Sequence, residues 1–303
     1  MKKILFVCKV SKSTGTGHIR RAAFLSKFLE SKTKILFFGD KSIGENICSE
    51  AIYIKSYIDI FNEINRFKPN WIVMDRQKNS SNLIKRLKKS GTKILLIEDD
   101  SFAGKYADIV WDANVKIKKD GYITGFEKVL LNPKVFDHKK KKYNDSAGSI
   151  FICLGGTDIN QNIPFLIKNL SDKGLYLHVF PGSRYVEYLK YKKADVKIYN
   201  EKENIFHIAR QCDIAIVSGG ITMYEMVYLG IPTIVWPQVY HQKNNTLQLL
   251  EKNIIKIADS KQEILKVIMS FVDKTEKYYE FLSFIKDLSI GNGIKDFKNI
   301  LEG

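Results

Sequence analysis

A histidine follows two glycines near the start of the chain, in the stretch SKSTGTGHIR (residues 11–20). Glycine lets the backbone bend sharply and approach a ligand closely, and the start of a helix favours an anion. An imidazole ordinarily titrates near physiological pH and is suited to general base catalysis. Gly15, Gly17 and His18 therefore predict a ligand-binding loop. A simple turn with a histidine that caps the next helix fits the same residues.

A second pair of glycines lies in the stretch DIAIVSGGITMYEM (residues 213–226). Backbone amides near Gly220, Ile221 and Thr222 are placed to cradle a diphosphate at the start of a helix. Glu225, in the first turn of that helix, is placed to accept hydrogen bonds from both hydroxyls of a ribose. Thr222 and Glu225 also have the spacing of a capping box, which would give the glutamate a structural role instead. The residues by themselves leave both interpretations open.

Strands and helices that alternate along the chain must position the residues of these two glycine-containing stretches. Apolar, β-rich runs are separated by amphipathic helical patterns such as residues 19–29 and 81–89, which is typical of parallel sheets covered on both faces. The pattern restarts after the polar stretch 133–148. The predicted strands are residues 3–8, 34–38, 71–74, 93–97 and 109–111, and then 149–154, 175–180, 195–198, 213–217 and 233–236. We expect two Rossmann-like α/β domains, residues 1–140 and 141–303, with a ligand cleft beyond the carboxyl ends of their strands.

Composition narrows the class of protein. The chain of 303 residues has a formal charge of +16, but its lysines are spread widely and its only dense run is HKKKKY, residues 138–143. With so few arginines, a nucleic-acid site is not expected. Apolar runs are too short for a signal peptide or a membrane span, so we expect a cytoplasmic protein, and a monomer. Four scattered cysteines predict buried free thiols: Cys8, Cys48, Cys153 and Cys212.

Five motifs follow one another along the chain: GTGH, MDRQKNSSNLIKRLKKSGTKILLIEDD, ADIVWDAN, ICLGGTD and SGGITMYEM…LGIPTIVWP…HQKNN. Their order resembles that of the UDP-sugar hydrolases of pseudaminic acid biosynthesis and the related spore-coat polysaccharide proteins. It is more distantly similar to the lipid II N-acetylglucosaminyltransferase. The resemblance covers residues 3–248, and two features depart from it: His241 beside Gln242, and the lysine-rich segment 139–142.

The resemblance implies a glycosyltransferase-B fold that binds a UDP-sugar mainly through its second half, with His18 as the catalytic residue and Glu225 on the ribose. It also implies that the tail packs back across the cleft, and that no metal or cofactor takes part. Magnesium at the acidic residues 98–100 is the alternative. Asp158 and Asn162 are expected as N-cap and helix residues. The residues expected to bind the UDP-sugar are Gly15, Gly17, Gly155, Gly156, Thr157, Gly219, Gly220, Ile221, Thr222, Glu225, His241 and Gln242.

The implied reaction is hydrolysis at the anomeric carbon, with neutral His18 taking a proton from the attacking water. One alternative is a sugar transferase, in which an acceptor hydroxyl replaces water. Tyr185, Tyr188 and Tyr191 would then hold an acceptor or associate weakly with a membrane surface. Another alternative is a non-catalytic partner that only binds a nucleotide sugar.

Overall fold

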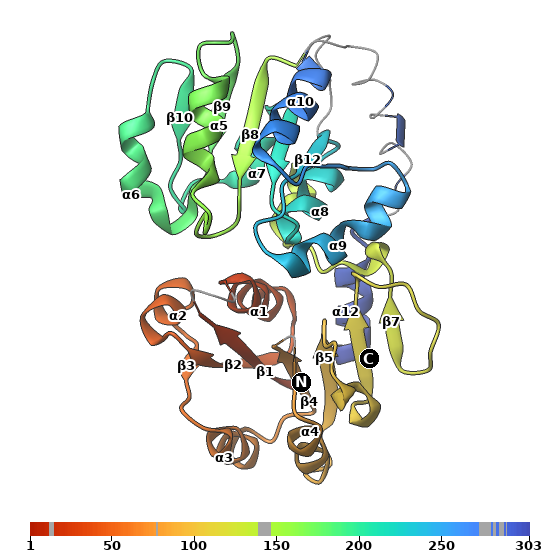
Figure 1. Cartoon of the computed structure of the whole chain (residues 1–303). Coiled ribbons are helices and arrows are strands. Elements are labelled where there is room, and N and C mark those ends of the chain that lie inside the picture. The colour runs from red at the N-terminus through yellow and green to blue at the C-terminus, as the bar shows by residue number, and fades with distance from the viewer. Residues whose placement is uncertain are drawn as a thin grey trace. The chain divides into compact units, whose positions relative to one another are not determined.

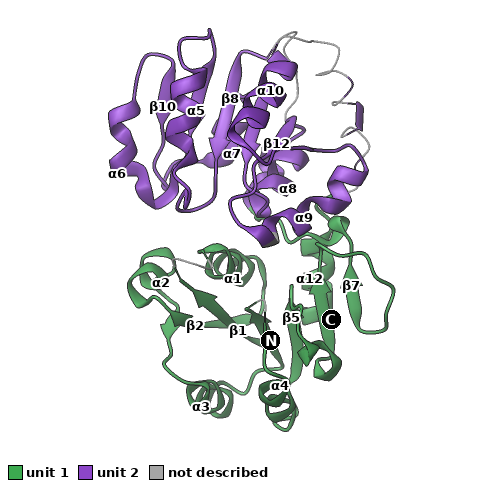
Figure 2. Cartoon of the chain, in the orientation of Figure 1, with its two compact units in different colours: residues 1–133, 290–303 green, residues 134–289 purple. Residues whose placement is uncertain are grey.

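The computed structural model describes residues 1–11, 15–76, 78–138, 147–272 and 290–303, together with residues 280, 283, 284 and 288 (Figure 1). The lysine-rich segment 139–142 lies outside these residues. The chain forms two compact units: residues 1–133 with 290–303 are unit 1, and residues 134–289 are unit 2 (Figure 2). The division thus falls between Pro133 and Lys134 rather than at residue 140. The last helix belongs to unit 1, although the sequence assigns the whole tail to the second domain.

Unit 1 is built on a seven-stranded sheet in which every pairing is parallel, in the order β3-β2-β1-β4-β5-β6-β7. The chain runs from β1 to β3 in one direction and then from β4 to β7 in the other. The order therefore reverses between β1 and β4, which is where open α/β sheets bind ligands. The strands are β1 (Lys3–Val10), β2 (Lys32–Gly39), β3 (Ile52–Tyr53), β4 (Trp71–Asp75), β5 (Lys93–Ile97), β6 (Ile109–Asp112) and β7 (Tyr122–Thr124).

Helices cover both faces of this sheet. Alternate residues of β1 and β4, among them Leu5, Val7, Ile72 and Met74, form a core with α3 and α4, while α1 lies on the opposite face (Figure 1). The helices of unit 1 are α1 (Gly17–Phe28), α2 (Lys41–Ile47), α3 (Tyr57–Phe67), α4 (Ser81–Lys88) and α12 (Gly293–Glu302), with 3₁₀ turns at Phe102–Tyr106 and Phe126–Lys128.

Helix α12 completes the core of unit 1 although it follows unit 2 in the sequence. Phe297 packs edge-on against Trp111 with ring centroids 5.4 Å apart, and the Trp111 Nε1–H donates to the carbonyl of Lys128 at 2.8 Å. A Cβ on Gly293 would lie 2.4 Å from that same carbonyl oxygen. The close approach therefore requires glycine at the start of α12.

Unit 2 contains a six-stranded sheet, again parallel throughout, in the order β10-β9-β8-β11-β12-β13. Its order reverses between β8 and β11. The strands are β8 (Ser149–Cys153), β9 (Tyr176–Val179), β10 (Val196–Ile198), β11 (Ile214–Val217), β12 (Thr233–Val235) and β13 (Lys256–Ile257). The helices are α5 (Asn162–Leu170), α6 (Tyr185–Tyr188), α7 (Ile205–Ala209), α8 (Ile221–Tyr228), α9 (Tyr240–Glu251) and α10 (Lys261–Val272), with 3₁₀ turns at Pro133–Asp137, Gly182–Arg184 and Leu189–Tyr191.

The predicted fold class is confirmed, since both sheets are parallel and strands alternate with helices. All ten predicted strands are present, and β3, β7 and β13 are additional. The four cysteines are free and buried, as predicted. Within the described residues, no helix combines the length and apolar character needed to cross a membrane.

Candidate active site

His18 lies at the point where the strand order of unit 1 reverses. After β1 the Gly15 amide donates a hydrogen bond to the Ser11 carbonyl at 2.8 Å, and Gly15 has a left-handed φ of 77° that favours glycine. Helix α1 begins at Gly17, with Thr16 as its N-cap. Gly17 and His18 are therefore the first two residues of a helix rather than part of the loop that the sequence predicts.

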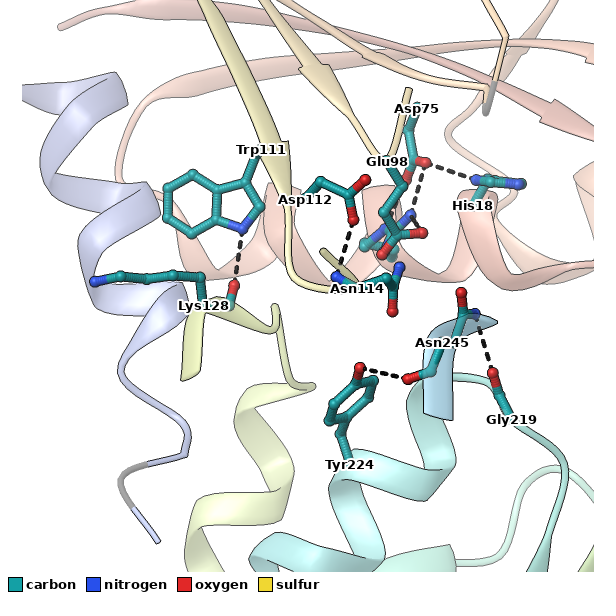
Figure 3. Close-up of polar contacts among 11 residues, drawn as sticks. His18, Asp75, Glu98, Trp111, Asp112, Asn114, Lys128, Gly219, Tyr224 and Asn245 are labelled. Atoms are coloured by element: carbon teal, nitrogen blue, oxygen red, sulfur yellow. Dashed lines mark hydrogen bonds and ion pairs between the residues drawn. The ribbon is translucent and has the colours of Figure 1, made fainter. Parts of the chain in front are cut away.

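The imidazole of His18 is hydrogen-bonded to the carboxylate of Asp75, the last residue of β4 (Figure 3). His18 Nδ1 lies 2.6 Å from Asp75 Oδ1, and the two residues are 7% and 1% exposed. An Nδ1–H that donates to Asp75 leaves the Nε2 lone pair available to take a proton. The alternative of a histidine that only caps α1 is wrong, because its ring bonds to a neighbouring strand instead.

Arg21, one turn further along α1, joins two carboxylates. Its Nε and Nη2 lie 2.7 and 2.8 Å from the oxygens of Asp75, and its Nη1 and Nη2 lie 2.5 and 3.0 Å from those of Glu98. Burial would raise the pKa of Asp75, but the charges and hydrogen bonds of Arg21 and His18 outweigh it and hold that pKa below its usual range. Asp75 is therefore a carboxylate at neutral pH.

Sequence reasoning missed Arg21, Asp75 and the role of Glu98. One signal was available: Arg21 stands three residues after His18, on the helix face that also carries Ile19, Ala22 and Leu25. An arginine on a buried face needs a carboxylate partner.

The three acidic side chains of residues 98–100 each contact different partners. Glu98 pairs with Arg21. Asp99 accepts hydrogen bonds from the Ser101 amide at 2.8 Å and from Asn79 Nδ2 at 2.5 Å, and Asp100 lies 3.8 Å from Lys78. In the part of the chain that the structure describes, no three His, Cys, Asp or Glu side chains are arranged to hold a metal ion.

Asp112, at the end of β6, is a half-buried carboxyl beside this cluster (Figure 3). One of its oxygens accepts the Asn114 amide at 2.9 Å. Burial, together with the negative charge of Glu98, raises the pKa of Asp112 to about 6, against the opposing effects of the Asn114 amide and Arg21. The carboxyl is thus a group that titrates close to neutral pH at the carboxyl edge of the sheet.

Replacing Asp112 with asparagine is expected to stabilise the fold at pH 7.5 by roughly 1–3 kcal/mol. Because the pKa of Asp112 is higher in the folded state, about 6, than in the unfolded state, about 3.9, ionisation costs stability as the pH rises through that interval. Urea unfolding at pH 7.5 and pH 4.5 measures the effect, and the advantage of Asp112→Asn should shrink at the lower pH. An equal advantage at both values would contradict it.

In unit 2 the glycine loops gather at the other reversal of strand order, between β8 and β11. Gly155, with φ of 84°, follows β8, and a Cβ built on it would lie 3.5 Å from Ser218 Oγ after β11. The Gly156 carbonyl accepts the Ser183 amide at 2.9 Å, and Thr157 is the next residue. The predicted diphosphate loops of unit 2 are therefore neighbours.

The loop after β11 also packs on the start of α9. A Cβ on Gly219 would lie 2.4 Å from the carbonyl oxygen of Gln242, so only glycine allows this approach. Asn245 Nδ2 donates to the Gly219 carbonyl at 3.0 Å, and the Tyr224 hydroxyl donates to the Asn245 carbonyl at 3.1 Å (Figure 3). Gln242 Oε1 accepts the Gln238 amide at 2.7 Å. Two predicted site residues, Gly219 in the loop before α8 and Gln242 in α9, are thus held close together.

Glu225 is buried in α8, with 6% of its surface exposed. The helix begins at Ile221 and its N-cap is Gly220, which provides no side-chain cap. Thr222 is consequently inside the helix, and the capping-box alternative for Thr222 and Glu225 is wrong. Glu225 also lies one turn further along than predicted, because no acidic residue occupies the first turn. The amides of Gly220, Ile221 and Thr222 are at the free N-terminal end of α8, as a diphosphate site needs.

Asp158 has the structural role that the sequence predicts. Its carboxylate accepts the amides of Asn162 and Ile163 at the start of α5, each at 3.0 Å, although the N-cap residue itself is Gln161. The Tyr188 hydroxyl also donates to it, at 2.8 Å.

His241, predicted to contact the sugar, and the three predicted tyrosines all lie in unit 2. His241 is the second residue of α9, next to Gln242. Tyr188 is buried, with Tyr191 packed edge-on against its ring. The three tyrosines at 185, 188 and 191 therefore do not form one exposed surface, because Tyr188 faces the core of unit 2.

Comparison with known proteins places the chain among relatives of low identity, and no family model matches it. An uncharacterized protein of Methanocaldococcus jannaschii is 26% identical over 267 aligned residues, which cover 77% of this chain but only 55% of that relative. The spore coat polysaccharide biosynthesis protein SpsG of Bacillus subtilis is 25% identical, with 75% of each chain covered. The UDP-2,4-diacetamido-2,4,6-trideoxy-beta-L-altropyranose hydrolase of Campylobacter jejuni is 25% identical, with 75% of this chain and 88% of the relative covered. The resemblance drawn from the motifs is confirmed.

Solved structures share the fold at lower identity. MurG of Acinetobacter baumannii superimposes with a TM-score of 0.67 at 13% identity, over 100% of this chain and 99% of that one. The spinosyn rhamnosyltransferase SpnG gives a TM-score of 0.67 at 11% identity over both whole chains. S. aureus MnaA, solved with UDP, gives 0.65 at 13% identity over 100% and 96%. The glycosyltransferase-B fold is therefore confirmed.

Proposed function

We propose that the protein is a UDP-sugar hydrolase that cleaves the anomeric C–O bond of a modified UDP-linked amino sugar and releases UDP. The reaction would serve the biosynthesis of a nonulosonic acid or a surface polysaccharide, in the cytoplasm. The hydrolase and spore-coat relatives support the substrate class and the pathway class, at 25% identity each.

The observation that carries the proposal is the buried hydrogen bond between His18 and Asp75. It lies at the carboxyl end of β4, where the strand order reverses, and its partner carboxylate stays ionised. Asp75 fixes the orientation of the ring and accepts the Nδ1–H, so that Nε2 is the proton acceptor.

The reaction balances with water as the only other reactant. A water oxygen forms a bond to the anomeric carbon, and the bond from that carbon to the diphosphate oxygen breaks. Nε2 of His18 takes the proton of the attacking water, and the electron pair of the broken bond leaves with UDP. Asp75 stabilises the imidazolium that results.

Unit 2 would hold the nucleotide. The backbone amides at the start of α8, with those of Gly155, Gly156 and Thr157, would stabilise the charge that develops on the departing diphosphate. Glu225 would accept the ribose hydroxyls. Gln242 and His241 would contact the sugar.

Incubation with a panel of UDP-sugars without any acceptor, following UDP release, tests the proposal. In H₂¹⁸O the label should enter the free sugar and not UDP, because the C–O bond breaks. Label in the phosphate of UDP, or no release with any N-acylated UDP-amino sugar, would overturn it.

A glycosyltransferase is the second candidate, favoured by the fold that the chain shares with the rhamnosyltransferase SpnG. In that reaction His18 would take the proton of an acceptor hydroxyl instead of the proton of water. UDP release that appears only when a glycan acceptor is added would identify it. UDP binding without release under either condition would instead support a non-catalytic binding protein.

A further inference from the structure

Arg21 is the centre of a buried ion-pair network in unit 1. It contacts Asp75 through Nε and Nη2 and Glu98 through Nη1 and Nη2, at 2.5–3.0 Å. Only 7% of Arg21 and 1% of Asp75 are exposed, so solvent screens their charges weakly. The two carboxylates raise the pKa of Arg21, against the effect of burial, and it remains a cation.

Glu98 is held in this network at the cost of backbone strain. It has a left-handed φ of 50°, which is unfavourable for a residue with a side chain. Its amide donates to the Trp111 carbonyl at 2.8 Å, and its carboxylate forms two bonds with Arg21. The strained backbone thus places the Glu98 carboxylate on the buried guanidinium of Arg21, beside the proposed base.

In the described part of the chain, three charged groups form the ion-pair network beside His18. Arg21 carries one positive charge between the negative charges of Asp75 and Glu98, so the network has a net charge of about −1 before Asp112 ionises. Other titratable groups on the elements packed here include Cys8, whose thiol pKa is raised by burial, and Arg76, which directly follows Asp75, stacks on Phe38 and Tyr57 and adds a further positive charge. On α1 itself Arg20 donates from Nε to Thr16 at 3.2 Å, and β1 carries Lys9. The ion pairs Lys41–Glu45 and Lys34–Glu63 lie on α2, β2 and α3.

We propose that Arg21 is a positioning residue that divides its charge between Asp75 and Glu98 and thereby keeps His18 neutral enough to accept a proton from water. The inference rests on the proposed function. A lone buried carboxylate beside His18 would favour the imidazolium and block the base at neutral pH. The positive charge of Arg21 offsets the negative charge of Asp75. The negative charge of Glu98 in turn reduces the effect of Arg21 on His18. The pair together sets the pH range in which the base works.

Glu98→Gln tests the charge balance. Glutamine keeps an oxygen that can accept from Arg21 but removes one negative charge, so the imidazolium is disfavoured. The acidic limb of the pH–rate profile should move to lower pH by about one unit. Because Asp112 ionises more readily once Glu98 is neutral, the double variant Glu98→Gln/Asp112→Asn should show the larger shift.

Arg21→Lys separates charge from geometry. Lysine keeps the positive charge but loses the two-pronged contacts, so turnover should fall while the acidic limb stays in place. Glu63→Gln is the matched control, since Glu63 is a buried carboxylate of unit 1 that pairs with Lys34 instead. It should leave both the limb and the turnover unchanged.

Titration of the His18 ring by NMR in the ligand-free protein provides a readout that does not depend on turnover. The His18→Asn spectrum assigns the signal. A titration midpoint that moves to lower pH in Glu98→Gln and stays in place in Glu63→Gln supports the inference. Identical midpoints in wild type and Glu98→Gln overturn it, whether or not the protein hydrolyses a UDP-sugar. Retained turnover in His18→Asn would overturn the proposed function alone.

Discussion

His18→Asn is expected to lower acceptor-free release of UDP by at least about 100-fold, the usual scale for removing a positioned general base. Asparagine can still donate a hydrogen bond to Asp75, which also keeps its bonds to Arg21, so the buried carboxylate is not left unpaired. The wild-type rate should fall as the pH drops and His18 becomes protonated. That acidic limb should be missing in the variant. Initial rates from pH 5 to pH 9 measure both effects.

The matched control is His178→Asn. His178 is a half-buried histidine of unit 2 whose Nδ1 lies 2.9 Å from the Tyr199 hydroxyl, so its replacement tests the loss of a histidine away from the proposed base. It should leave the rate unchanged. UDP affinity should also survive in His18→Asn, since the nucleotide is assigned to unit 2. A His18→Asn protein with the wild-type rate and pH profile would remove His18 from the reaction.

Glu225→Gln is expected to weaken UDP binding by roughly 1–3 kcal/mol, which is roughly 5- to 150-fold in affinity. The neutral amide is a weaker acceptor than the carboxylate for the two ribose hydroxyls. Glutamine preserves the size of the side chain within the buried face of α8, so the fold should persist. Isothermal titration calorimetry with UDP measures the change.

Glu251→Gln controls for the loss of one carboxylate in unit 2, because Glu251 is an exposed residue at the end of α9. Its UDP affinity should match that of the wild type. An unchanged affinity in Glu225→Gln as well would show that Glu225 does not contact the nucleotide, and that its burial serves the helix alone.

Much of the fold could be predicted because the core strands are continuous apolar runs. β4 and β11 are buried along their whole lengths and β8 at every residue after its first, and such runs between amphipathic helices indicate parallel sheets directly. The strands that escaped prediction, β3, β7 and β13, have two or three residues and only partial burial. A run that short shows no periodicity, and its neighbours in the sheet decide whether it pairs.

The site was harder to predict where it depends on contacts between distant residues. Arg21 meets its carboxylates 54 and 77 residues away, and no local pattern links them. Thr222 and Glu225 illustrate the opposite error: their spacing matches a capping box, but the capping box does not form. Since α8 begins at Ile221 after a glycine N-cap, the spacing of a capping box occurs inside the helix, where a side chain cannot cap it.

The return of α12 to unit 1 has a consequence for biogenesis. A ribosome that makes this chain synthesises the whole of unit 2 before the residues that pack against Trp111, so the sheet of unit 1 waits with an apolar surface uncovered. Ile294, Phe297 and Leu301 cover that surface only after unit 2 has been made. Until then, the uncovered residues are of the kind that chaperones shield in a growing chain. Completion of the sheet that carries the proposed base therefore depends on a helix made after the whole of unit 2.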